Sequence, residues 1–249
     1  ATTMERNHFI LNAKSILLIL FLVTSGCATT KNLSNDFNPE DPYEKSNRKV
    51  FEFNNKIDKL FLRPVTDFYD SATPEFAQTS ITNFFSNLDD IGISFNNFLQ
   101  GNIVDSMSDI TRFFINSIFG LGGFFDVASE MGLEKHSEDF GQTLGKWGAK
   151  PGPYLMLPFL GPSTTRDAFT FVGDTALAPT LSLNDSEARI GLISLDLINT
   201  YSAFTGIADI ESQDQYAFLR DAYLDRRKFE VNDGLSQEDL SQDQDFEDF

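Results

Sequence analysis

The chain has 249 residues, enough for one large domain with a hydrophobic core of its own. Acidic residues outnumber basic residues 37 to 19, and the net charge of −18 argues against nucleic acid or an anionic membrane surface as an electrostatically recruited partner. The single cysteine excludes an intramolecular disulfide and a thiolate-built zinc site. The aromatic residues comprise 26 Phe, 6 Tyr and 1 Trp, so the chain carries much apolar surface that needs cover from water.

Residues 1–26 have the features of a secretory signal peptide, with residues 1–3 lying upstream of a start at Met4. A weakly basic leader precedes an apolar run over residues 16–23, which is too short to span a bilayer core about 30 Å thick. Small residues then lead to the only cysteine, Cys27. The order of these features predicts export of the chain rather than a buried N-terminal helix or strand.

The residues Thr24-Ser25-Gly26-Cys27 resemble the lipobox of bacterial lipoproteins. The resemblance implies that Cys27 carries fatty acyl chains such as palmitate and becomes the N-terminus of the mature protein. Several chains give a durable anchor, because each buried methylene contributes roughly 0.8 kcal/mol. Ala28 takes the place of the aspartate that retains many Gram-negative lipoproteins at the inner membrane. The resemblance therefore implies the periplasmic face of the outer membrane as the destination.

The polarity of the remaining chain predicts three regions. Residues 27–40 are polar and contain a proline, so we expect a lipidated flexible tether. Residues 233–249 are crowded with Asp, Glu, Gln and Ser, which is typical of a disordered acidic tail. Between them, residues 41–232 are expected to form a helical, membrane-embedded domain. This region contains no long uncharged apolar run, so its membrane contact must come from helices lying in the bilayer plane.

Two helix-start signals open this domain. Asp41-Pro42-Tyr43-Glu44 reads as a capping box and predicts a helix to about Leu60, and Thr73-Pro74-Glu75 precedes a second helix. The second helix carries an apolar stripe at steps of three and four: Ile81, Phe84, Leu88, Ile91, Phe95 and Phe98. Its opposite face carries Asn83, Asn87, Asp90 and Asn97. Periodicity alone favours the core of a soluble bundle over a lipid-facing surface for such a stripe.

A third helix after Gly101 is predicted to present one apolar face: Ile103, Met107, Ile110, Phe114 and Leu121. Residues 113–125 are apolar on every face of a helix, so they must be buried in protein or in lipid. Together with the acyl anchor, this segment favours the lipid-facing interpretation. A helix break is predicted at Gly120, Gly122 and Gly123. Two further helices are predicted near residues 190–210 and over residues 214–229.

Glycine and proline are concentrated between Phe140 and Pro162, which predicts a loop or hairpin instead of a helix. Its apolar side chains, among them Trp147 and Tyr154, need cover from protein or lipid. The predicted hinge positions of this hairpin loop are Gly141, Gly145, Gly148, Gly152 and Pro153. The sequence leaves open both a moving gate and a static packed turn.

Catalytic chemistry has few candidate residues. The processed chain would contain one histidine, His136, and it lies in the charged stretch 134–139, which we expect to be solvated. The sequence contains no phosphate-cradling loop, no metal-binding histidine pair and no dinucleotide fingerprint. We therefore predict a protein that is not an enzyme, with no catalytic residues, no metal and no cofactor. A phospholipase stays open as a weaker alternative.

Short stretches that keep their order from about Asp41 to Asp167 resemble one known family. They include Asp41-Pro42-Tyr43-Glu44, Arg63-Pro64-Val65, Asn83-Phe84, Phe98-Leu99-Gln100-Gly101, Thr111-Arg112-Phe113-Phe114, Gly120-Leu121-Gly122-Gly123-Phe124, Phe140-Gly141-Gln142-Thr143-Leu144-Gly145, Gly152-Pro153-Tyr154 and Leu157-Pro158-Phe159. The final helix, with Arg220, Ala222 and Tyr223, is also similar. In series, these stretches resemble the MlaA or VacJ lipoproteins of the Gram-negative outer membrane.

The resemblance implies an all-α fold: a ring-like bundle of amphipathic helices in the membrane plane, with a Gly/Pro-rich apolar hairpin loop and no sheet of consequence. It also implies a central amphipathic channel beside the glycine break. Through this channel the protein would remove mislocalised phospholipids from the outer leaflet and pass them to a periplasmic lipid-carrier protein, in association with an outer-membrane porin trimer. A structural or surface-displayed lipoprotein is the main alternative, and it would need neither channel nor hinge.

Overall fold

The structure is a computed structural model that describes residues 38–205 and 213–233. The described residues from Pro39 onward belong to one compact unit, which contains all the elements below. The predicted signal peptide, Cys27 and most of the predicted tether lie outside the described residues, as does the predicted acidic tail after Asp233. None of the helices in the described ranges has both the length and the apolar character needed to cross a bilayer.

The first helical segment runs without a break through α2 (Glu44–Ile57), the π-helical turn η1 (Asp58–Leu62) and α3 (Arg63–Ala72). Pro64 accounts for the wider turn, because proline has no N–H to donate and its ring crowds the preceding helical turn. At this point the Arg63 N–H donates to the Asp58 carbonyl, five residues back. The helix therefore continues past Leu60, where the sequence pattern predicts its end.

The predicted capping box at Asp41 is wrong. Helix α2 begins at Glu44, and its N-cap residue Tyr43 provides no side-chain cap. The Asp41 carboxylate instead accepts hydrogen bonds from Asn47 Nδ2 at 2.8 Å and from the Tyr216 hydroxyl at 2.5 Å. Tyr216 lies on α10 (Gln215–Val231), far away in the sequence, so Asp41 ties the two ends of the domain together.

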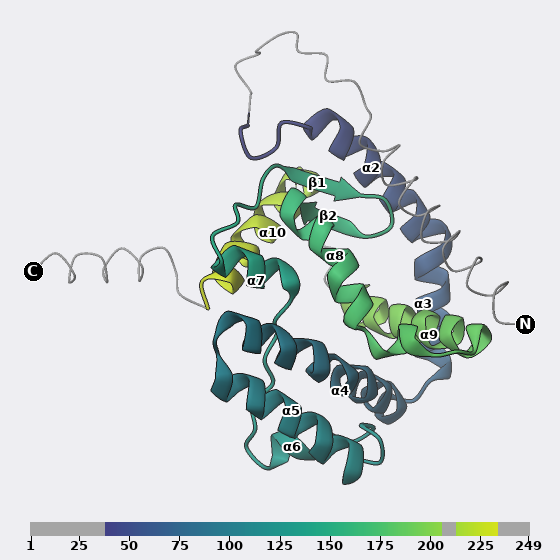
Figure 1. Ribbon diagram of the computed structural model, residues 1–249. Coiled ribbons are helices and arrows are strands. Elements are labelled where there is room, and N and C mark those ends of the chain that lie inside the picture. The colour runs from purple at the N-terminus through teal and green to yellow at the C-terminus, as the bar shows by residue number, and fades with distance from the viewer. Residues whose placement is uncertain (1–37, 206–212, 234–249) are drawn as a thin grey trace, which may run out of the picture. The chain divides into compact units, whose positions relative to one another are not determined.

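Helices α4 (Glu75–Gln100) and α5 (Ile103–Ile118) lie side by side as a helical hairpin (Figure 1). Gly101 closes α4 in the left-handed region at φ +88°, a conformation that glycine adopts without a steric penalty. The short helix α6 (Val127–Glu130) packs on α5. Leu121, which the sequence places on the third helix, lies beyond its end, in the turns that follow Ile118.

The Gly/Pro-rich segment contains more regular structure than predicted. Residues Phe140–Lys146 form helix α7, so the prediction of a loop is wrong there. Asp139 caps this helix, because its side chain accepts the Gln142 N–H at 2.8 Å. Further on, β1 (Tyr154–Leu157) and β2 (Gly161–Thr164) pair antiparallel, with Tyr154 opposite Thr164 and Leu157 opposite Gly161.

Helix α8 (Thr165–Leu177) follows the hairpin directly and has no counterpart among the predicted helices. A 3₁₀ turn, η2 (Pro179–Ser182), then leads to α9 (Ser186–Thr205), which corresponds to the helix predicted near residues 190–210. Residues 206–210 of that prediction lie outside the described residues. The predicted helix over residues 214–229 is confirmed as α10, with Asp214 as its N-cap.

The packing partners of these elements follow one another in a closed circuit. Helix α3 packs on α9, α9 on α4, α4 on α7, and α7 on α8 and α10. Both α8 and α10 contact β2, and β1 contacts α2, the helix that leads back to α3. The β-hairpin thus lies between α2, the first helix described, and α10, the last (Figure 1). The prediction of a mostly helical fold with only a minor sheet is confirmed.

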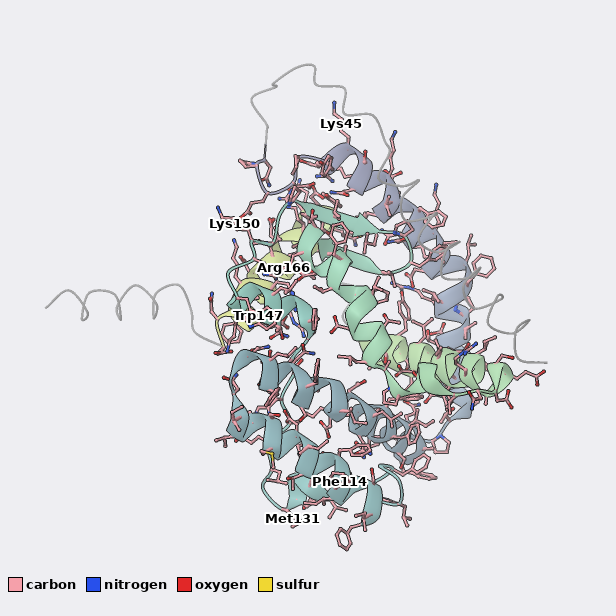
Figure 2. All side chains as sticks on the ribbon, viewed as in Figure 1. Lys45, Phe114, Met131, Trp147, Lys150 and Arg166 are labelled. Atoms are coloured by element: carbon pink, nitrogen blue, oxygen red, sulfur yellow. The ribbon has the colours of Figure 1, made fainter. Side chains whose placement is uncertain are left out.

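The buried side chains are mostly polar. Among the described residues, seven apolar side chains are buried, against nineteen polar or charged ones. The apolar cluster is small and consists of Tyr154, Met156, Tyr216 and Leu224. Large apolar side chains such as Phe114 and Met131 are exposed instead (Figure 2). This distribution is the reverse of that in a water-soluble domain, where charged residues are seldom fully buried.

Helix α4 shows the reversal most clearly. Its polar face is buried, with Asn87, Asp90 and Asn97 almost inaccessible to solvent. Its apolar stripe is half-buried at first and exposed toward the C-terminal end, where Phe98 is 59% exposed. The interpretation of this stripe as the core of a soluble bundle, which periodicity alone favours, does not fit this arrangement.

Candidate functional site

A seam of polar side chains joins α4 to α5. The Ser94 hydroxyl donates to the Ser106 carbonyl, and the Ser106 hydroxyl donates to the Ser94 carbonyl, both at 2.8 Å. One turn further along, Asn97 Nδ2 donates to Asp109 Oδ2 at 2.8 Å. These side chains are buried, and hydrogen bonds of this kind hold two helices together where apolar surface is directed outward.

Arg112 is the largest fully buried side chain of the described residues, with 1% of its surface exposed. Its Nη2 binds both oxygens of Asp126 at 3.1 Å, and its Nη1 donates to Ser129 Oγ at 3.0 Å. Its Nε lies 3.7 Å from the buried carboxylate of Asp90. Burial would raise the pKa of Asp126, but hydrogen bonds from Ser129 and Asn116 outweigh it and lower that pKa to about 2.

His136 is more tightly held than its charged neighbourhood predicts. Its Nδ1 lies 2.6 Å from the carboxylate of Asp109, which is fully buried. Its Nε2 faces a second carboxylate, Asp105, at 3.7 Å. Glu134, Lys135 and Ser137 are exposed, as expected, but the His136 side chain is only 27% exposed and is held between the two carboxylates. In a catalytic triad, the ring nitrogen opposite the buried acid faces a hydroxyl nucleophile, and here that position faces another acid.

The predicted glycine break lies where α5 gives way to a series of turns. Gly122 and Gly123 have φ of +78° and +99°, which glycine adopts most readily. A Cβ atom at Gly123 would lie 2.7 Å from Asn87 Nδ2, so this glycine allows the chain to approach α4 closely. A Cβ at Gly120 would collide with the carbonyl oxygen of Phe125 and would lie 2.5 Å from that of Asn116. These contacts explain the glycines by turn geometry, and their position beside a channel stays a prediction.

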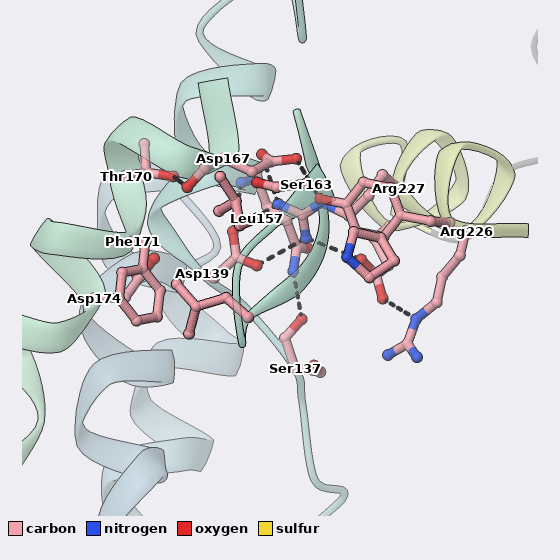
Figure 3. Close-up of a pocket in the computed structure, with 15 residues that line it drawn as sticks. Ser137, Asp139, Leu157, Ser163, Asp167, Thr170, Phe171, Asp174, Arg226 and Arg227 are labelled. Atoms are coloured by element: carbon pink, nitrogen blue, oxygen red, sulfur yellow. Dashed lines mark hydrogen bonds and ion pairs between the residues drawn. The ribbon is translucent and has the colours of Figure 1, made fainter. Parts of the chain in front are cut away.

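A cavity of about 370 Å³ lies among α7, α8, α10 and the β-hairpin. Its lining combines acids and arginines with the apolar side chains Leu157, Leu160 and Phe171. Figure 3 shows Asp167, Thr170 and Asp174 projecting from α8, and Arg226 and Arg227 coming from α10. A cavity with both polar and apolar walls fits a ligand that is itself amphipathic.

Arg227 binds three acids of this cavity at once, and one of them is Glu230 on its own helix, at 2.9 Å. Its Nη1 and Nη2 bind Asp139 at 2.7 and 3.0 Å, and Nη2 also binds Asp167 Oδ1 at 2.9 Å. Burial would raise the pKa of Asp167, but the hydrogen bonds and charge of Arg227 outweigh it and lower that pKa to about 2. A Cβ at Gly141 would lie 2.6 Å from Arg227 Nη2, so this glycine leaves room for the cluster.

The other predicted hinge residues fall into two groups. Gly145 is packed in α7, where a Cβ would lie 2.6 Å from Arg166 Nη1. Gly148 and Gly152 lie in the connection between α7 and β1, with φ of +91° and +71°, and Pro153 directly precedes β1. A Cβ at Gly148 would meet no atom within 4 Å. At Gly152 a Cβ would lie 3.0 Å from Thr165 Cβ, so of these four glycines Gly148 alone has open space around it.

Asp89 on α4 is exposed to solvent, yet the surrounding protein raises its pKa to about 6. Burial among protein atoms is the main cause, and the charge of Asp196 on α9 adds to the rise. Burial also raises the pKa of Asp196. The two carboxylates thus lie close enough to repel one another, where α4 packs on α9.

The cavity residues are the part of the site that the sequence reasoning missed. One signal was present: Thr164-x-x-Asp167 has the spacing of a helix start, and the Thr164 hydroxyl accepts the Asp167 N–H at 3.2 Å. That signal would have placed α8, and with it Asp167, Thr170 and Asp174 on one helix. No comparable signal links them to Arg227, since the approach of α10 is a tertiary contact.

These features define a class of protein: a mostly helical domain with a polar interior and many large apolar side chains exposed, which is the arrangement expected beside lipid. Comparison with known proteins narrows the class. The chain matches the family described as MlaA lipoprotein over residues 39–230. It belongs to that family.

Two relatives and one solved structure illustrate the match. The intermembrane phospholipid transport system lipoprotein MlaA of Shigella flexneri is 35% identical over 215 residues, which make up 84% of each chain. Its counterpart from Escherichia coli is 34% identical over the same share. A structure solved under the heading "Structural basis for maintenance of bacterial outer membrane lipid asymmetry" is 36% identical. It matches with a TM-score of 0.67 and covers 77% of this chain and 98% of that chain.

Proposed function

We propose that this protein is an outer-membrane lipoprotein that removes mislocalised phospholipids from the outer leaflet and passes them to a periplasmic carrier, so that lipid asymmetry is maintained. The names of the relatives from Shigella flexneri and Escherichia coli support phospholipid transport between membranes. The subject of the matched structure, outer-membrane lipid asymmetry, supports the membrane concerned.

The observation that carries the proposal is the reversed polarity of the fold. Large apolar side chains on α3, α4, α5 and α8 are exposed, while serine, asparagine, aspartate and arginine fill the interior. Fully burying one large apolar side chain contributes roughly 1.5–3 kcal/mol, so hydrocarbon around these helices would stabilise the domain substantially. We infer that the contact is made by helices lying within one leaflet, with these exposed apolar side chains directed into the hydrocarbon.

A route for a phospholipid needs a wet path for the headgroup and apolar surface for the acyl chains. The closed circuit of packed elements supports the ring-like arrangement with a central passage. Asp89 and Asp196, which lie on the packed helices α4 and α9 with surface that water reaches, are candidates for its polar wall. Movement through such a passage needs no cofactor, because lipid can move down its own concentration gradient.

We propose Cys27 as the acylated anchor and the periplasmic face of the outer membrane as the location, on the lipobox resemblance. The partners are phospholipid, a porin trimer and a periplasmic lipid-carrier protein. The hinge of the apolar loop is proposed at Gly148, Gly152 and Pro153. Gly141 and Gly145 are poorer hinge candidates, because their surroundings are closely packed.

The alternatives make different predictions in cells. Deleting the gene should expose phospholipid in the outer leaflet, and the intact protein should restore asymmetry. Cys27→Ala should fail to restore it, because the body is no longer held at the membrane. An unchanged outer leaflet after deletion would favour a structural or surface-displayed lipoprotein.

His136→Ala tests the phospholipase alternative. We expect this variant to restore asymmetry, because the protein transports lipid without hydrolysing it. Lysophospholipid and free fatty acid should stay at the same level with and without the protein. Loss of complementation together with loss of hydrolysis products would support an enzyme instead.

A further inference from the structure

The first helical segment carries a row of lysines whose charge the fold does not use. Four of them, on α2 and η1, are exposed: Lys45, Lys49, Lys56 and Lys59. Among the described residues, no carboxylate forms an ion pair with any of these four ammonium groups. The arginines of the same segment are both paired, Arg48 with Glu44 at 2.7 Å and Arg63 with Asp58 at 2.9 Å. The four lysines, here called the lysine row, are therefore available to a partner outside the described chain.

Two asparagines fix the direction in which the lysine row faces. The Asn47 side chain accepts the backbone N–H of Met156 on β1 at 3.0 Å. Seven residues later, the Asn54 side chain accepts the N–H of Phe159, at the turn of the same hairpin, at 2.9 Å. Because an α-helix turns about 100° per residue, both asparagines lie on the side of α2 opposite the lysine row. The row is thus directed away from the β-hairpin, as Lys45 is in Figure 2.

One flank of the lysine row is apolar. Phe53 and Leu60 lie about two helical turns apart beside the row, and they are 41% and 68% exposed. The Phe53 ring packs edge-on against the exposed Phe159, with the ring centroids 5.3 Å apart. Exposed apolar side chains continue into α3 at Val65 and Phe68. The lysines therefore run along the border of an apolar surface that has no protein cover.

The other flank of the row is polar. There Arg48 pairs with Glu44 of its own helix and with Asp214, the N-cap residue of α10, at 2.6 Å. Across α2, the surface thus changes from ion pairs through unpaired lysines to exposed phenylalanine and leucine. Helices that lie at a membrane interface have this order. Their lysines reach the headgroups, while the aromatic and aliphatic side chains enter the acyl region.

The lysine row is a local exception to the negative charge of the chain. Glu52 lies on the same face between Lys49 and Lys56, so four lysines and one glutamate leave a net charge of +3. The net charge of −18 acts on a partner at a distance, but salt largely screens charges more than about 8 Å away. Once the proposed acyl anchor has brought the domain to the bilayer, the local charge decides which lipid lies beside α2.

We propose that this face of α2 lies at the headgroup level of the leaflet and binds the phosphate of an anionic phospholipid, phosphatidylglycerol, through Lys49, Lys56 and Lys59. Phe53 and Leu60 enter the acyl region beside the bound lipid. The inference rests on the membrane contact of the proposed function and adds the class of lipid that this surface selects. It does not depend on whether the protein transports lipid.

The selectivity follows from charge. The phosphate of phosphatidylcholine or phosphatidylethanolamine is offset by the cation of its own headgroup, whereas phosphatidylglycerol keeps a net negative charge for the lysines. One lysine near an anionic lipid surface strengthens binding about fivefold. Lys45 lies about 12 Å before Phe53 along the helix axis, beyond the apolar flank, so it meets water and adds little.

The test uses the full-length acylated protein in phosphatidylcholine nanodiscs. A bimane label on Leu60→Cys is quenched at short range by lipids with a spin label on the acyl chain, and the unsubstituted protein is the labelling blank. Phosphatidylglycerol and phosphatidylcholine carrying the same labelled chain are compared at equal fractions. We expect phosphatidylglycerol to associate with position 60 at least about fivefold more tightly. A label at Phe114→Cys on α5, a helix without lysine, should be quenched equally by both lipids.

Charge variants show whether the lysine row causes the preference. Lys56→Gln and Lys59→Gln together should abolish it, while Glu52→Gln should strengthen it. Lys150→Gln removes an exposed lysine from the connection between α7 and β1, so it is the matched control and should have no effect. The preference should also weaken in about 1 M salt, where the screening length falls to about 3 Å.

The acidic C-terminal segment is the competing occupant of the row, since residues 234–249 contain six acids. Ending the chain at Asp233 should leave the quenching unchanged. Stronger quenching by phosphatidylglycerol after this truncation would assign the row to the segment and overturn the inference. Equal quenching by the two lipids at position 60, or a preference that survives the double lysine variant, would also overturn it.

These outcomes are separable from failure of the proposed function. Outer-leaflet phospholipid in the deletion strain tests transport, and a variant without the lipid preference that still restores asymmetry would leave transport standing. If neither lipid quenched the label at position 60 or at position 114, the membrane contact on which the function and the inference both rest would be wrong.

Discussion

Ser94 on α4 and Ser106 on α5 exchange hydrogen bonds, each hydroxyl donating to the other residue's backbone carbonyl at 2.8 Å. Both residues are buried, whereas Phe98 and Met107, which lie nearby on the same two helices, are exposed. The two helices therefore meet along their polar faces. In water, such a pair of helices would expose its apolar side chains to solvent. In hydrocarbon the same arrangement is favourable, because the polar groups between the helices form hydrogen bonds with one another.

The serine pair makes the first prediction. Ser94→Ala and Ser106→Ala should each lower the free energy of unfolding by about 1 kcal/mol, the usual net contribution of a hydrogen bond. The double variant should lose less than the sum, because the two hydroxyls belong to one contact. Unfolding titrations in mixed micelles measure the cycle, with the exposed Ser46→Ala as control. Losses near zero for both single variants would show that the seam does not hold the hairpin.

Arg112 makes a larger contribution to stability. Arg112→Met should destabilise the protein by about 3–5 kcal/mol, because Asp90 stays buried with a weaker counter-charge. Arg112→Lys should lie between that variant and the wild type, since an ammonium cannot reproduce the two bonds to Asp126. Thermal unfolding in micelles measures both, and the exposed Lys45→Met is the control. If Arg112→Met were as stable as the wild type, the charge of Arg112 would not stabilise the buried carboxylate of Asp90.

The glycines of α7 and α4 should respond in opposite directions to the same change. Gly141→Ala places a Cβ 2.6 Å from Arg227 Nη2 and should separate Arg227 from Asp139 and Asp167, with loss of stability. Gly92→Ala meets no atom within 4 Å and should stabilise α4 by about 0.5–1 kcal/mol. Melting temperatures of the two variants test this contrast. A Gly141→Ala protein as stable as wild type would place the cluster further from α7.

Acid should act on two groups of carboxylates with opposite signs. The pKa of Asp126 and of Asp167 is lowered to about 2, so the stability they contribute is present above about pH 4 and is lost as the pH falls to 2. Burial, with a contribution from the charge of Asp139, raises the pKa of Asp174 from 3.8 to about 6. The folded state therefore binds this proton more readily than the unfolded state, and protonation stabilises it as the pH falls from 6 to 4.

Asp174→Asn should remove this stabilising contribution between pH 6 and 4 and leave the loss below pH 4 unchanged. Unfolding titrations at pH 7.5, 5 and 3 measure it, with Asp225→Asn as the matched control. If both variants showed the same pH profile as the wild type, Asp174 would have an ordinary pKa and a more exposed environment than the structure gives it.

The sequence predicts which helices are amphipathic and leaves open which face is turned inward. The apolar stripe with Phe84, Leu88 and Phe95 has the same period whether it packs against other helices or faces lipid. Periodicity identifies an apolar face of a helix but does not say what covers that face. The direction became clear only from the burial of Asp90 and Asn97. The starts of α4, α5 and α10 were predictable from local signals. Asp41 misleads because its partner Tyr216 is remote, and the local caps of α7 and α8, at Asp139 and Thr164, were missed among the glycines and prolines.

The candidate cavity could not be predicted from the sequence for a related reason. Three of its acids lie just before α7 and on α8, at Asp139, Asp167 and Asp174, and its arginines lie about 60 to 90 residues later than Asp167 and Asp139, on α10. The many glycines of residues 140–162 indicate a loop, but Gly141 and Gly145 lie inside helix α7. Glycine occupies these two helical positions because a larger side chain would collide with the arginines packed against the helix. A close approach between distant elements uses glycine just as a turn does, and composition cannot separate the two.

The environment of the exposed phenylalanines tests the central claim most directly. Spin labels at Phe98→Cys, Phe114→Cys and, as an aqueous control, Lys45→Cys are introduced into the protein in lipid nanodiscs, with the unsubstituted protein as labelling blank. Collision rates with oxygen, which concentrates in hydrocarbon, are compared with those of a water-soluble nickel complex. The structure predicts labels at positions 98 and 114 that collide with oxygen and are protected from nickel, and a label at position 45 with the reverse behaviour. Free access of nickel to positions 98 and 114 would contradict a lipid-facing exterior.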